Sequence, residues 1–538
     1  MLRTVDDKNT QNTASPRRFL TSLGSGIFMS LTLLLSSALL IYSYLQEPRP
    51  LLAWLAFIPF ALGIFRIKSS FIGFLYGMVF GLVSYMGIIY WIGPTVYSGL
   101  ADAAMANAAA VALSAVLALQ FGLFGFICVH LKKARWLFPL AGACAWVALE
   151  LAHQLIALKF MSFPWFVLGY TQAGNTALIQ ISAFGGAYAV SFLVMIFTLG
   201  MAVVAGAKAR MATRILWLIL PLILIAGSLV YGERAMRRYS RFLDSNPQKL
   251  SVALMQPYTH KLMFEGYEED VVYTIHEQAS ALAGKHIDLI IWPESSYPGS
   301  YEDPDYYKFL QDISAKNNNA YQITGSWHAG EGGDYVSAAL FNKDGFLDVY
   351  NKTKLVPFGE FLPWHRHLKQ FYDKYEISSF TGTFITGAEP GKLLEININD
   401  KIFRVGANIC FESLFPSVWR AQAKEGAQFF VNISNDGWFL DSAAPYQHLR
   451  ANIFRAVENR RPLLRSTNTG ISAWVDALGN IKYETALNKQ ETALINFAFQ
   501  PKAGKTFYTV YGDIFAYLCA FLALSVFIYC AVFLSEDK

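Results

Sequence analysis

Three short stretches of the sequence hold residues that could carry out nucleophilic chemistry. They are "WPES" with Glu294, "YNKTKLVPFGEFLP" with Lys352, and "ICFES" with Cys410. The thiolate is the nucleophilic form of cysteine, but a thiol at its ordinary pKa is mostly protonated at neutral pH. A carboxylate can take that proton, and an ammonium group can favour the thiolate and then stabilise an oxyanion. Together these residue types suit attack on a carbonyl carbon.

Each of these residues also has a simpler interpretation when it is taken alone. Glu294 could be an exposed carboxylate at a strand end, Lys352 a solvated loop lysine, and Cys410 a packed core thiol. Glu360, eight residues after Lys352, and Glu412 could be surface groups or ion-pair partners. The chemical interpretation therefore depends on a fold that brings these side chains together.

The segment that holds all of them, residues 232–512, has the pattern of an α/β domain. Short apolar runs alternate with segments of helical periodicity, which predicts a sheet covered by helices. We predict strands at 249–256, 286–294, 320–327, 402–410 and 427–434, two strands within 337–352, a hairpin at 470–481, and helices at 267–284, 307–318 and 446–461. Buried strands of this kind often end in loops that carry chemistry. Glu294 and Cys410 stand at such ends, and Lys352 closes another strand.

The rest of the chain has the composition of a membrane protein. Of its 538 residues 54% are hydrophobic and only 15% are charged, whereas a soluble protein carries roughly 25% charged residues. Apolar runs near the ~20 residues that a membrane span needs lie at 23–45, 50–66, 70–93, 104–131, 136–152, 178–206, 214–231 and 513–534, the second and fifth being short. The net charge of +5 is too diffuse for a nucleic-acid binder and fits a protein that lies against anionic lipid.

These runs predict five segments. We expect an N-terminal tail at 1–22, a membrane domain with seven spans at 23–231, an exported domain at 232–512, an eighth span at 513–534 and a tail at 535–538. Alternate loops are rich in lysine and arginine: Arg17 and Arg18, then Arg66 and Lys68, then Lys132, Lys133 and Arg135, then Lys208, Arg210 and Arg214. The positive-inside rule therefore places both termini in the cytoplasm and the exported domain on the opposite side.

The predicted topology also divides the five cysteines between the membrane spans and the exported domain. Cys128, Cys144, Cys519 and Cys530 lie within apolar spans, where small inert side chains are expected. Cys410 is the only cysteine of the exported domain, so it has no partner there for an intrachain disulfide. An unpaired thiol in an oxidising compartment is a candidate for function.

The motifs, taken in order, resemble those of one family. "FPWFVLGYTQ" (163–172), "LVPFGE" before and including Glu360, "NISNDGWF" (432–439) and "RAVENRRPLLRSTNTGISAWVD" (455–476) accompany the three stretches above. With the predicted topology they resemble the apolipoprotein N-acyltransferases, which are membrane members of the nitrilase, or carbon-nitrogen hydrolase, superfamily. The resemblance extends from about the first span to the last.

The resemblance implies a fold and a set of site residues. The expected fold is an α-helical bundle of eight transmembrane helices plus an exported nitrilase-like αββα sandwich. The expected catalytic triad is Glu294, Lys352 and Cys410. The supporting residues that it implies are Glu360, Phe411 and Glu412, and the residues that it places near the substrate are Trp165 and Phe264. Phe411 and Phe264 stand where many relatives have tyrosine and tryptophan.

The resemblance also implies an activity. Cys410 would take the sn-1 acyl chain of a phospholipid, with phosphatidylethanolamine as the expected donor, and form a thioester. The α-amino group of a diacylglyceryl-cysteine at a lipoprotein N-terminus would then receive the acyl chain. The protein is expected to be a monomer in the bacterial inner membrane with its catalytic domain in the periplasm, and to need no cofactor, metal or nucleic acid.

Two other functions fit parts of the sequence. A membrane-anchored amidase of the nitrilase type would use the same triad to hydrolyse small amides, with water as the second nucleophile. A non-catalytic scaffold would leave the triad without a role. His365 and His367 form an H-x-H pair, but with no cysteine or third histidine close by we expect no metal there.

Overall fold

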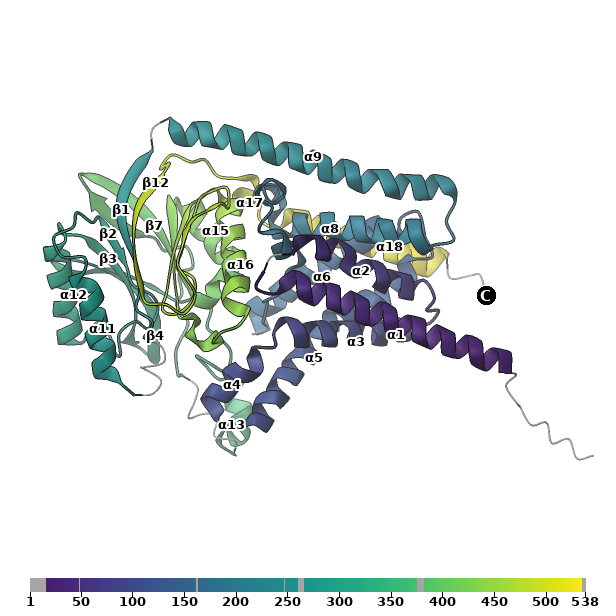
Figure 1. Cartoon of the computed structure of the whole chain (residues 1–538), viewed down its shortest axis with the longest axis horizontal. Helices are drawn as coiled ribbons and strands as arrows, with labels where there is room; N and C mark the ends of the chain where they lie inside the picture. Colours follow the sequence, from purple (N-terminus) through teal and green to yellow (C-terminus); the bar gives the residue numbers. More distant parts are fainter. Residues whose placement is uncertain are drawn as a thin grey trace, which may run out of the picture.

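The chain folds into a bundle of apolar helices beside a domain with two β-sheets (Figure 1). The computed structural model describes residues 16–47, 49–160, 163–245, 247–259, 266–374 and 382–534. Phe264, expected near the substrate, lies outside these described residues.

Seven helices of the described residues are long and apolar enough to cross a bilayer. They are α1 (Pro16–Tyr44), α3 (Ser70–Ile88), α5 (Ala103–Leu131), α6 (Phe138–Phe160), α8 (Ser182–Gly206), α9 (Met211–Asp244) and α18 (Ile514–Phe533). The remaining expected span is α2 (Pro50–Ile64), whose 15 residues cover about 22 Å at ~1.5 Å each, less than the ~30 Å hydrocarbon core. The predicted count of eight spans is therefore not confirmed. Phe57 and Phe60 of α2 are fully buried inside the bundle.

Small residues let helices α3 and α5 approach closely. A Cβ atom built on Gly77 would lie 2.1 Å from the carbonyl oxygen of Phe121, and one built on Gly125 would lie 2.2 Å from that of Gly73. Only glycine fits at such distances, and a stripe of small residues is a common way to pack helices in a membrane.

Two helices run past the C-terminal ends of their predicted spans. Helix α6 continues to Phe160 rather than ending near 152, and α9 continues to Asp244 rather than ending near 231. The 34 residues of α9 span about 51 Å, which exceeds the hydrocarbon core. The extension carries exposed Arg234, Arg237 and Arg238, so the apolar pattern marks where the bilayer ends but not where the helix ends.

The second domain contains two six-stranded sheets. The first has the order β12 (Glu491–Phe499), β1 (Gln248–Gln256), β2 (Leu289–Ile291), β3 (Tyr321–Gly330), β4 (Gly333–Asn342), β5 (Gly345–Asn351). The second has the order β11 (Ile481–Glu484), β10 (Ala473–Val475), β9 (Leu463–Thr467), β8 (Phe429–Ser434), β7 (Lys401–Ile409), β6 (Leu394–Ile398). Strands β1–β2–β3 and β7–β8–β9 are parallel and the flanking pairs antiparallel. The predicted α/β domain is confirmed.

Helices cover both outer faces of the two sheets, which gives the predicted αββα sandwich. Helices α11 (Glu268–Ser280) and α12 (Pro304–Lys316) lie on the outer face of the first sheet, far from the bundle (Figure 1). Helices α15 (Pro416–Glu425) and α16 (Ala444–Asn459) lie between the second sheet and the bundle. Nearly every residue of α16 is buried, because it packs on the sheet with one side and on membrane helices with the other. The bundle and the second sheet therefore share one apolar core.

Candidate active site

The expected lysine and two of the expected carboxylates are in direct contact. Lys352 follows β5, and its fully buried ammonium donates to Glu294 Oε1 at 2.9 Å and to Glu360 Oε1 at 2.5 Å. Glu294 lies in the loop after β2, and Glu360 in the loop after β5. The sandwich therefore brings together three residues that the sequence separates by up to 66 positions.

The second oxygen of each carboxylate is held by a backbone amide. Asn435 N–H, just after β8, donates to Glu294 Oε2 at 3.0 Å, and Val356 N–H donates to Glu360 Oε2 at 2.8 Å. The Asn435 contact joins the loops that follow a parallel strand in each sheet. Both carboxylates are thus oriented by backbone that the sheets fix.

Gly325 of β3 leaves the space that Glu294 occupies. A Cβ atom at this position would lie 2.4 Å from the Cα atom of Glu294 and 2.6 Å from the carbonyl oxygen of Pro293. Any larger residue would push the loop after β2 away from β3, and Glu294 would move with it.

Charge pairing keeps the ammonium protonated. Burial alone would lower the pKa of Lys352, but the carboxylates of Glu294 and Glu360 outweigh it and hold this pKa well above its usual value. Burial raises the pKa of Glu360, against the opposing effect of Lys352. The cluster therefore contains a permanent cation between two carboxyl groups.

Cys410 stands at the point where strand β7 ends and a short 3₁₀ helix, η2 (Cys410–Leu414), begins. Its φ of 47° lies in the left-handed region, which is uncommon for a residue with a side chain. Burial, then the charge of Glu294, raise the pKa of the thiol, and Lys352 offsets them only in part. The resting thiol is therefore neutral, and a base must remove its proton before it can attack. Cys410 is unpaired, as expected from the sequence.

Glu412 ties the lysine loop to the cysteine turn. Its Oε1 accepts hydrogen bonds from Tyr350 Oη (2.8 Å), Thr353 N–H (2.8 Å) and Thr353 Oγ1 (2.7 Å). Its Oε2 accepts from Ile409 N–H at 2.9 Å. Glu412 thus joins residues on both sides of Lys352 to Ile409, the residue before Cys410.

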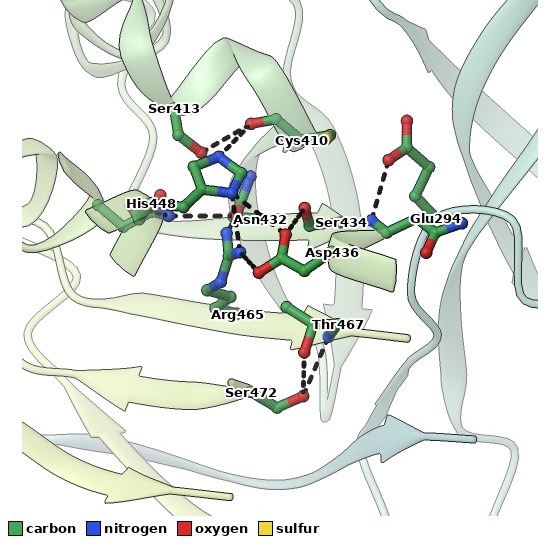
Figure 2. A network of polar contacts seen from close by, with 12 residues as sticks. Glu294, Cys410, Ser413, Asn432, Ser434, Asp436, His448, Arg465, Thr467 and Ser472 are labelled. Atoms are coloured by element: carbon green, nitrogen blue, oxygen red, sulfur yellow. Dashed lines mark hydrogen bonds and ion pairs between the residues drawn. The ribbon is translucent and has the colours of Figure 1, made fainter. Parts of the chain in front are cut away.

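A second charged cluster lies on the other side of Cys410, and the sequence did not predict it (Figure 2). Arg465 of β9 donates to Asp436 Oδ2 at 2.7 Å and also to Asn432. His448 of α16 has Nδ1 3.2 Å from Asp436 Oδ1 and Nε2 3.0 Å from the carbonyl oxygen of Cys410. All three charged or titratable side chains are at most 1% exposed. Burial raises the pKa of Asp436, but the charges of Arg465 and His448 and the hydrogen bonds with His448 and Ser434 together outweigh it and hold this pKa below its usual value.

An aromatic cluster connects the site to the membrane domain. The ring of Phe411 stacks on that of Phe163, with centroids 5.6 Å apart, and Phe163 stacks on Trp165. Trp165 is 2% exposed, and its Nε1 donates to Gln447 Oε1 at 2.7 Å. Its ring lies 5.6 Å from that of His448. The expected residues Phe411 and Trp165 are therefore parts of one packed cluster beside Cys410.

One signal for the missed residues was present in the sequence. The stretch "LLRST" places Arg465 directly after two leucines, and a charge in a buried strand must be paired. Asn435 and Asp436 likewise follow a buried strand directly. No feature of the sequence points to His448. Its helix is buried on all sides, so no polar face marks the position, and its partners come from three other elements of the fold.

Two family profiles match the chain. The carbon-nitrogen hydrolase profile matches residues 251–500, and the profile of the apolipoprotein N-acyltransferase N-terminal domain matches residues 36–200. These ranges coincide with the two-sheet domain and most of the helical bundle.

Similar proteins match nearly the whole length. An apolipoprotein N-acyltransferase of Geobacter metallireducens is 31% identical over 498 residues, which is 90% of this chain and 92% of that protein. One of Caulobacter vibrioides is 30% identical over 466 residues, 82% of each. Among solved structures, a CN-hydrolase superfamily protein of Xanthomonas campestris is 16% identical with a TM-score of 0.33, and covers 54% of this chain and 98% of that chain. By the identity and coverage of these relatives, this multi-pass membrane protein belongs to the apolipoprotein N-acyltransferase family.

Proposed function

We propose that this protein transfers an acyl chain from a membrane phospholipid to the N-terminal amine of a diacylglyceryl-cysteine, through a thioester on Cys410. The observation that carries the proposal is the Lys352 ammonium, which is buried and bonded to two carboxylates beside the unpaired cysteine at a strand end. The relatives named apolipoprotein N-acyltransferase supply the reaction class.

The first half-reaction acylates the cysteine. The Cys410 thiol gives its proton to Glu294 as the sulfur attacks the sn-1 ester carbon, so the net charge of the site does not change. Lys352 and the Phe411 backbone N–H stabilise the oxyanion of the tetrahedral intermediate. The carbon–oxygen bond then breaks, Glu294 returns the proton to the glycerol oxygen, and lysophospholipid leaves.

The second half-reaction transfers the acyl chain. The acceptor's α-amine attacks the thioester carbon, and the oxyanion forms at the same place. Glu294 takes a proton from the amine, the carbon–sulfur bond breaks, and Glu294 returns that proton to the sulfur, which restores the thiol of Cys410 and the carboxylate as the amide product leaves. The ping-pong order lets two lipids use one cleft in turn.

The buried charges and the aromatic cluster support the proposal of a lipid donor. The raised thiol pKa means that the nucleophile forms only when Glu294 accepts the proton, which limits reaction with chance electrophiles. Phe163, Trp165 and Phe411 form a packed apolar cluster between Cys410 and the membrane helices, and an acyl chain would need such apolar surroundings. Trp165 and Phe264 remain our proposed substrate contacts, and phosphatidylethanolamine our proposed donor.

The orientation and the oligomeric state are parts of the same proposal. The lysine and arginine residues in alternate loops favour a periplasmic catalytic domain in the bacterial inner membrane. We also propose that the protein acts as a monomer, as the family resemblance implies.

One experiment separates the transferase from a hydrolase. The purified protein is placed in vesicles of phosphatidylethanolamine labelled in the sn-1 acyl chain, with a synthetic diacylglyceryl-cysteine peptide as acceptor. We expect the label in an amide on the peptide, with an equal amount of lysophospholipid, and no transfer to a peptide whose α-amine is acetylated. Label that appears only as free fatty acid would support the hydrolase and overturn the transferase.

A further inference from the structure

Two side chains hold the carbonyl oxygen of the cysteine that is proposed to attack. His448 Nε2 lies 3.0 Å from the oxygen of Cys410, and Ser413 Oγ donates to the same oxygen at 2.8 Å. Both side chains are buried. Figure 2 shows this oxygen facing Ser413 and His448, with the sulfur of Cys410 on the opposite side.

The held oxygen determines where a neighbouring N–H points. The carbonyl group of Cys410 and the N–H of Phe411 belong to one planar peptide unit, and in a trans unit they point in opposite directions. The described residues contain no cis peptide bond. Fixing the oxygen therefore fixes the direction of the Phe411 N–H, which is the backbone donor proposed for the oxyanion.

The chemistry of the neighbours shows which nitrogen of His448 carries hydrogen. A carbonyl oxygen can only accept, so Nε2 must be the donor to Cys410. Arg465 Nη2 lies 3.1 Å from Nδ1 and can only donate, so Nδ1 accepts from it in the neutral ring. A protonated ring would instead donate from Nδ1 to Asp436 at 3.2 Å and would still carry hydrogen on Nε2. The bond to Cys410 is thus present in both forms.

The surrounding groups keep the imidazole in place. Burial, then the charge of Arg465, lower the pKa of His448, and Asp436 opposes them only in part, so the ring is neutral near pH 7. Asp436 is held by Arg465 at 2.7 Å and by Ser434 Oγ at 2.8 Å. Gly470 is needed beside it, because a Cβ atom there would lie 2.3 Å from Asp436 Oδ2.

We propose that His448 is the positioning residue of the oxyanion site: with Ser413 it fixes the peptide unit between Cys410 and Phe411 and so aims the Phe411 N–H at the substrate oxygen. Arg465 and Asp436 act one step further back, by fixing the tautomer and the plane of the ring. This inference rests on the proposed function, since it assigns a role within the acylation of Cys410.

The test compares two reactions of the same thiol. Acylation of Cys410 by an ester passes through an oxyanion, whereas alkylation by iodoacetamide is a direct displacement that forms none. The variants are His448→Leu, which has no donor, His448→Gln, whose amide can replace the Nε2–H donor, and Ser413→Ala, which removes the second donor. The substrates are phosphatidylethanolamine and p-nitrophenyl butyrate, a water-soluble activated ester.

We expect His448→Leu to lower kcat for acylation by about tenfold to a hundredfold, less than the full loss of an oxyanion donor, because the N–H remains but is poorly aimed. KM and the alkylation rate should stay within about twofold. His448→Gln should recover most of the loss, and Ser413→Ala should show a smaller loss of the same kind.

Other results would overturn the inference. Equal losses of acylation and alkylation would mean that His448 only maintains the fold, and unchanged acylation in both His448→Leu and Ser413→Ala would mean that the oxygen needs no holding. If His448→Leu does not fold, Ser413→Ala decides the question in the same way, because it removes the other donor to the same oxygen. If the wild-type protein takes no acyl group from phospholipid, the proposed function fails, while p-nitrophenyl butyrate still tests the role of His448.

Discussion

Two buried charge clusters flank Cys410, and they differ in balance and in access. The first, Glu294 with Lys352 and Glu360, holds two carboxyl groups against one cation, and the side chains of Glu294 and Glu360 are 8% and 16% exposed. The second, Asp436 with Arg465 and His448, pairs one anion with one cation around a neutral ring and is at most 1% exposed. The first cluster, which we propose accepts and returns a proton, thus keeps an unbalanced charge and some exposure. The second cluster, which we propose only fixes geometry, is balanced in charge and closed to solvent.

Removing the cation of the first cluster should have the largest effect. In Lys352→Met the two carboxylates lose their partner and the oxyanion loses a donor, so we expect kcat for acylation to fall by about 10²–10³. Breaking a buried ion pair should also destabilise the fold, by about 3–5 kcal/mol. The acylation rate and thermal unfolding in detergent measure the two effects.

The matched control is Lys354→Met. The Lys354 ammonium lies over the ring of Phe415, 6.0 Å from its centroid, and takes no part in the proposed chemistry. Similar losses in both variants would mean that removing any nearby positive charge lowers kcat, and that the contacts of Lys352 with Glu294 and Glu360 are not what matters.

Moving the base without removing it should have the next largest effect. In Gly325→Ala the new Cβ atom would lie 2.4 Å from the Cα atom of Glu294, so the loop must shift. A displacement near 1 Å costs about a hundredfold in rate, and we expect a fall in kcat of about 10–10². The acylation rate with saturating phospholipid measures it.

Gly504→Ala is the control for this glycine, because nothing lies within 4 Å of a Cβ atom built there. We expect it to leave kcat unchanged. A Gly325→Ala protein with normal kcat would contradict the placement of Glu294 as the base.

Weakening the hydrogen bonds by which Glu412 joins the lysine loop to the cysteine turn should affect stability more than rate. In Glu412→Gln an amide NH₂ group replaces one of the two carboxylate oxygens. It must then face at least one of the groups that now donate to Glu412, which belong to Tyr350, Thr353 and Ile409. An unsatisfied buried donor costs about 1–3 kcal/mol. We expect a lower Tm and a kcat within about tenfold of wild type. A loss of a hundredfold or more in kcat at unchanged Tm would place Glu412 in the chemistry instead.

The smallest effect concerns pH and the second cluster. The pKa of His448 is lowered in the fold, where it faces Arg465, Asp436 and the carbonyl oxygen of Cys410. In the unfolded chain His448 takes up a proton near pH 6.5, whereas in the folded protein it does so only at lower pH. The free energy of unfolding therefore keeps its full value above about pH 6.5 and decreases as the pH falls below it. One proton corresponds to at most about 1.4 kcal/mol per pH unit.

The comparison of Tm at pH 7 and pH 5 isolates this group. His448→Gln cannot titrate, so its Tm should fall less than that of wild type over this interval. An equal fall in both proteins would mean that His448 titrates alike in the folded and unfolded chains, and that the second cluster is not closed to protons.

The two clusters also differ in how well the sequence predicted them. Glu294, Lys352 and Cys410 each stand at the end of a predicted strand, and the ends of such strands are where residues that carry chemistry are expected. The second cluster combines a turn, a helix interior and strand β9, which the sequence analysis did not predict because Arg465 interrupts its apolar pattern. His448 gains its role only when α16 is placed against η2.

The same limit applies to the membrane domain. Apolar composition predicted the spanning helices, but α2 is too short to be counted with them, and α9 runs on past the bilayer with a polar sequence. Hydropathy reports the environment of a segment, whereas the point where a helix ends also depends on the helix propensity of the polar residues after the span.

The most direct test of the central claim is the mass of the intact protein after incubation with phosphatidylethanolamine and no acceptor. We predict one added acyl chain, located on Cys410, removed by neutral hydroxylamine as a thioester should be, and absent in Cys410→Ala. Adding the diacylglyceryl-cysteine peptide should discharge it. A wild-type protein that gains no acyl mass with any phospholipid, or that gains it equally in Cys410→Ala, would contradict the account.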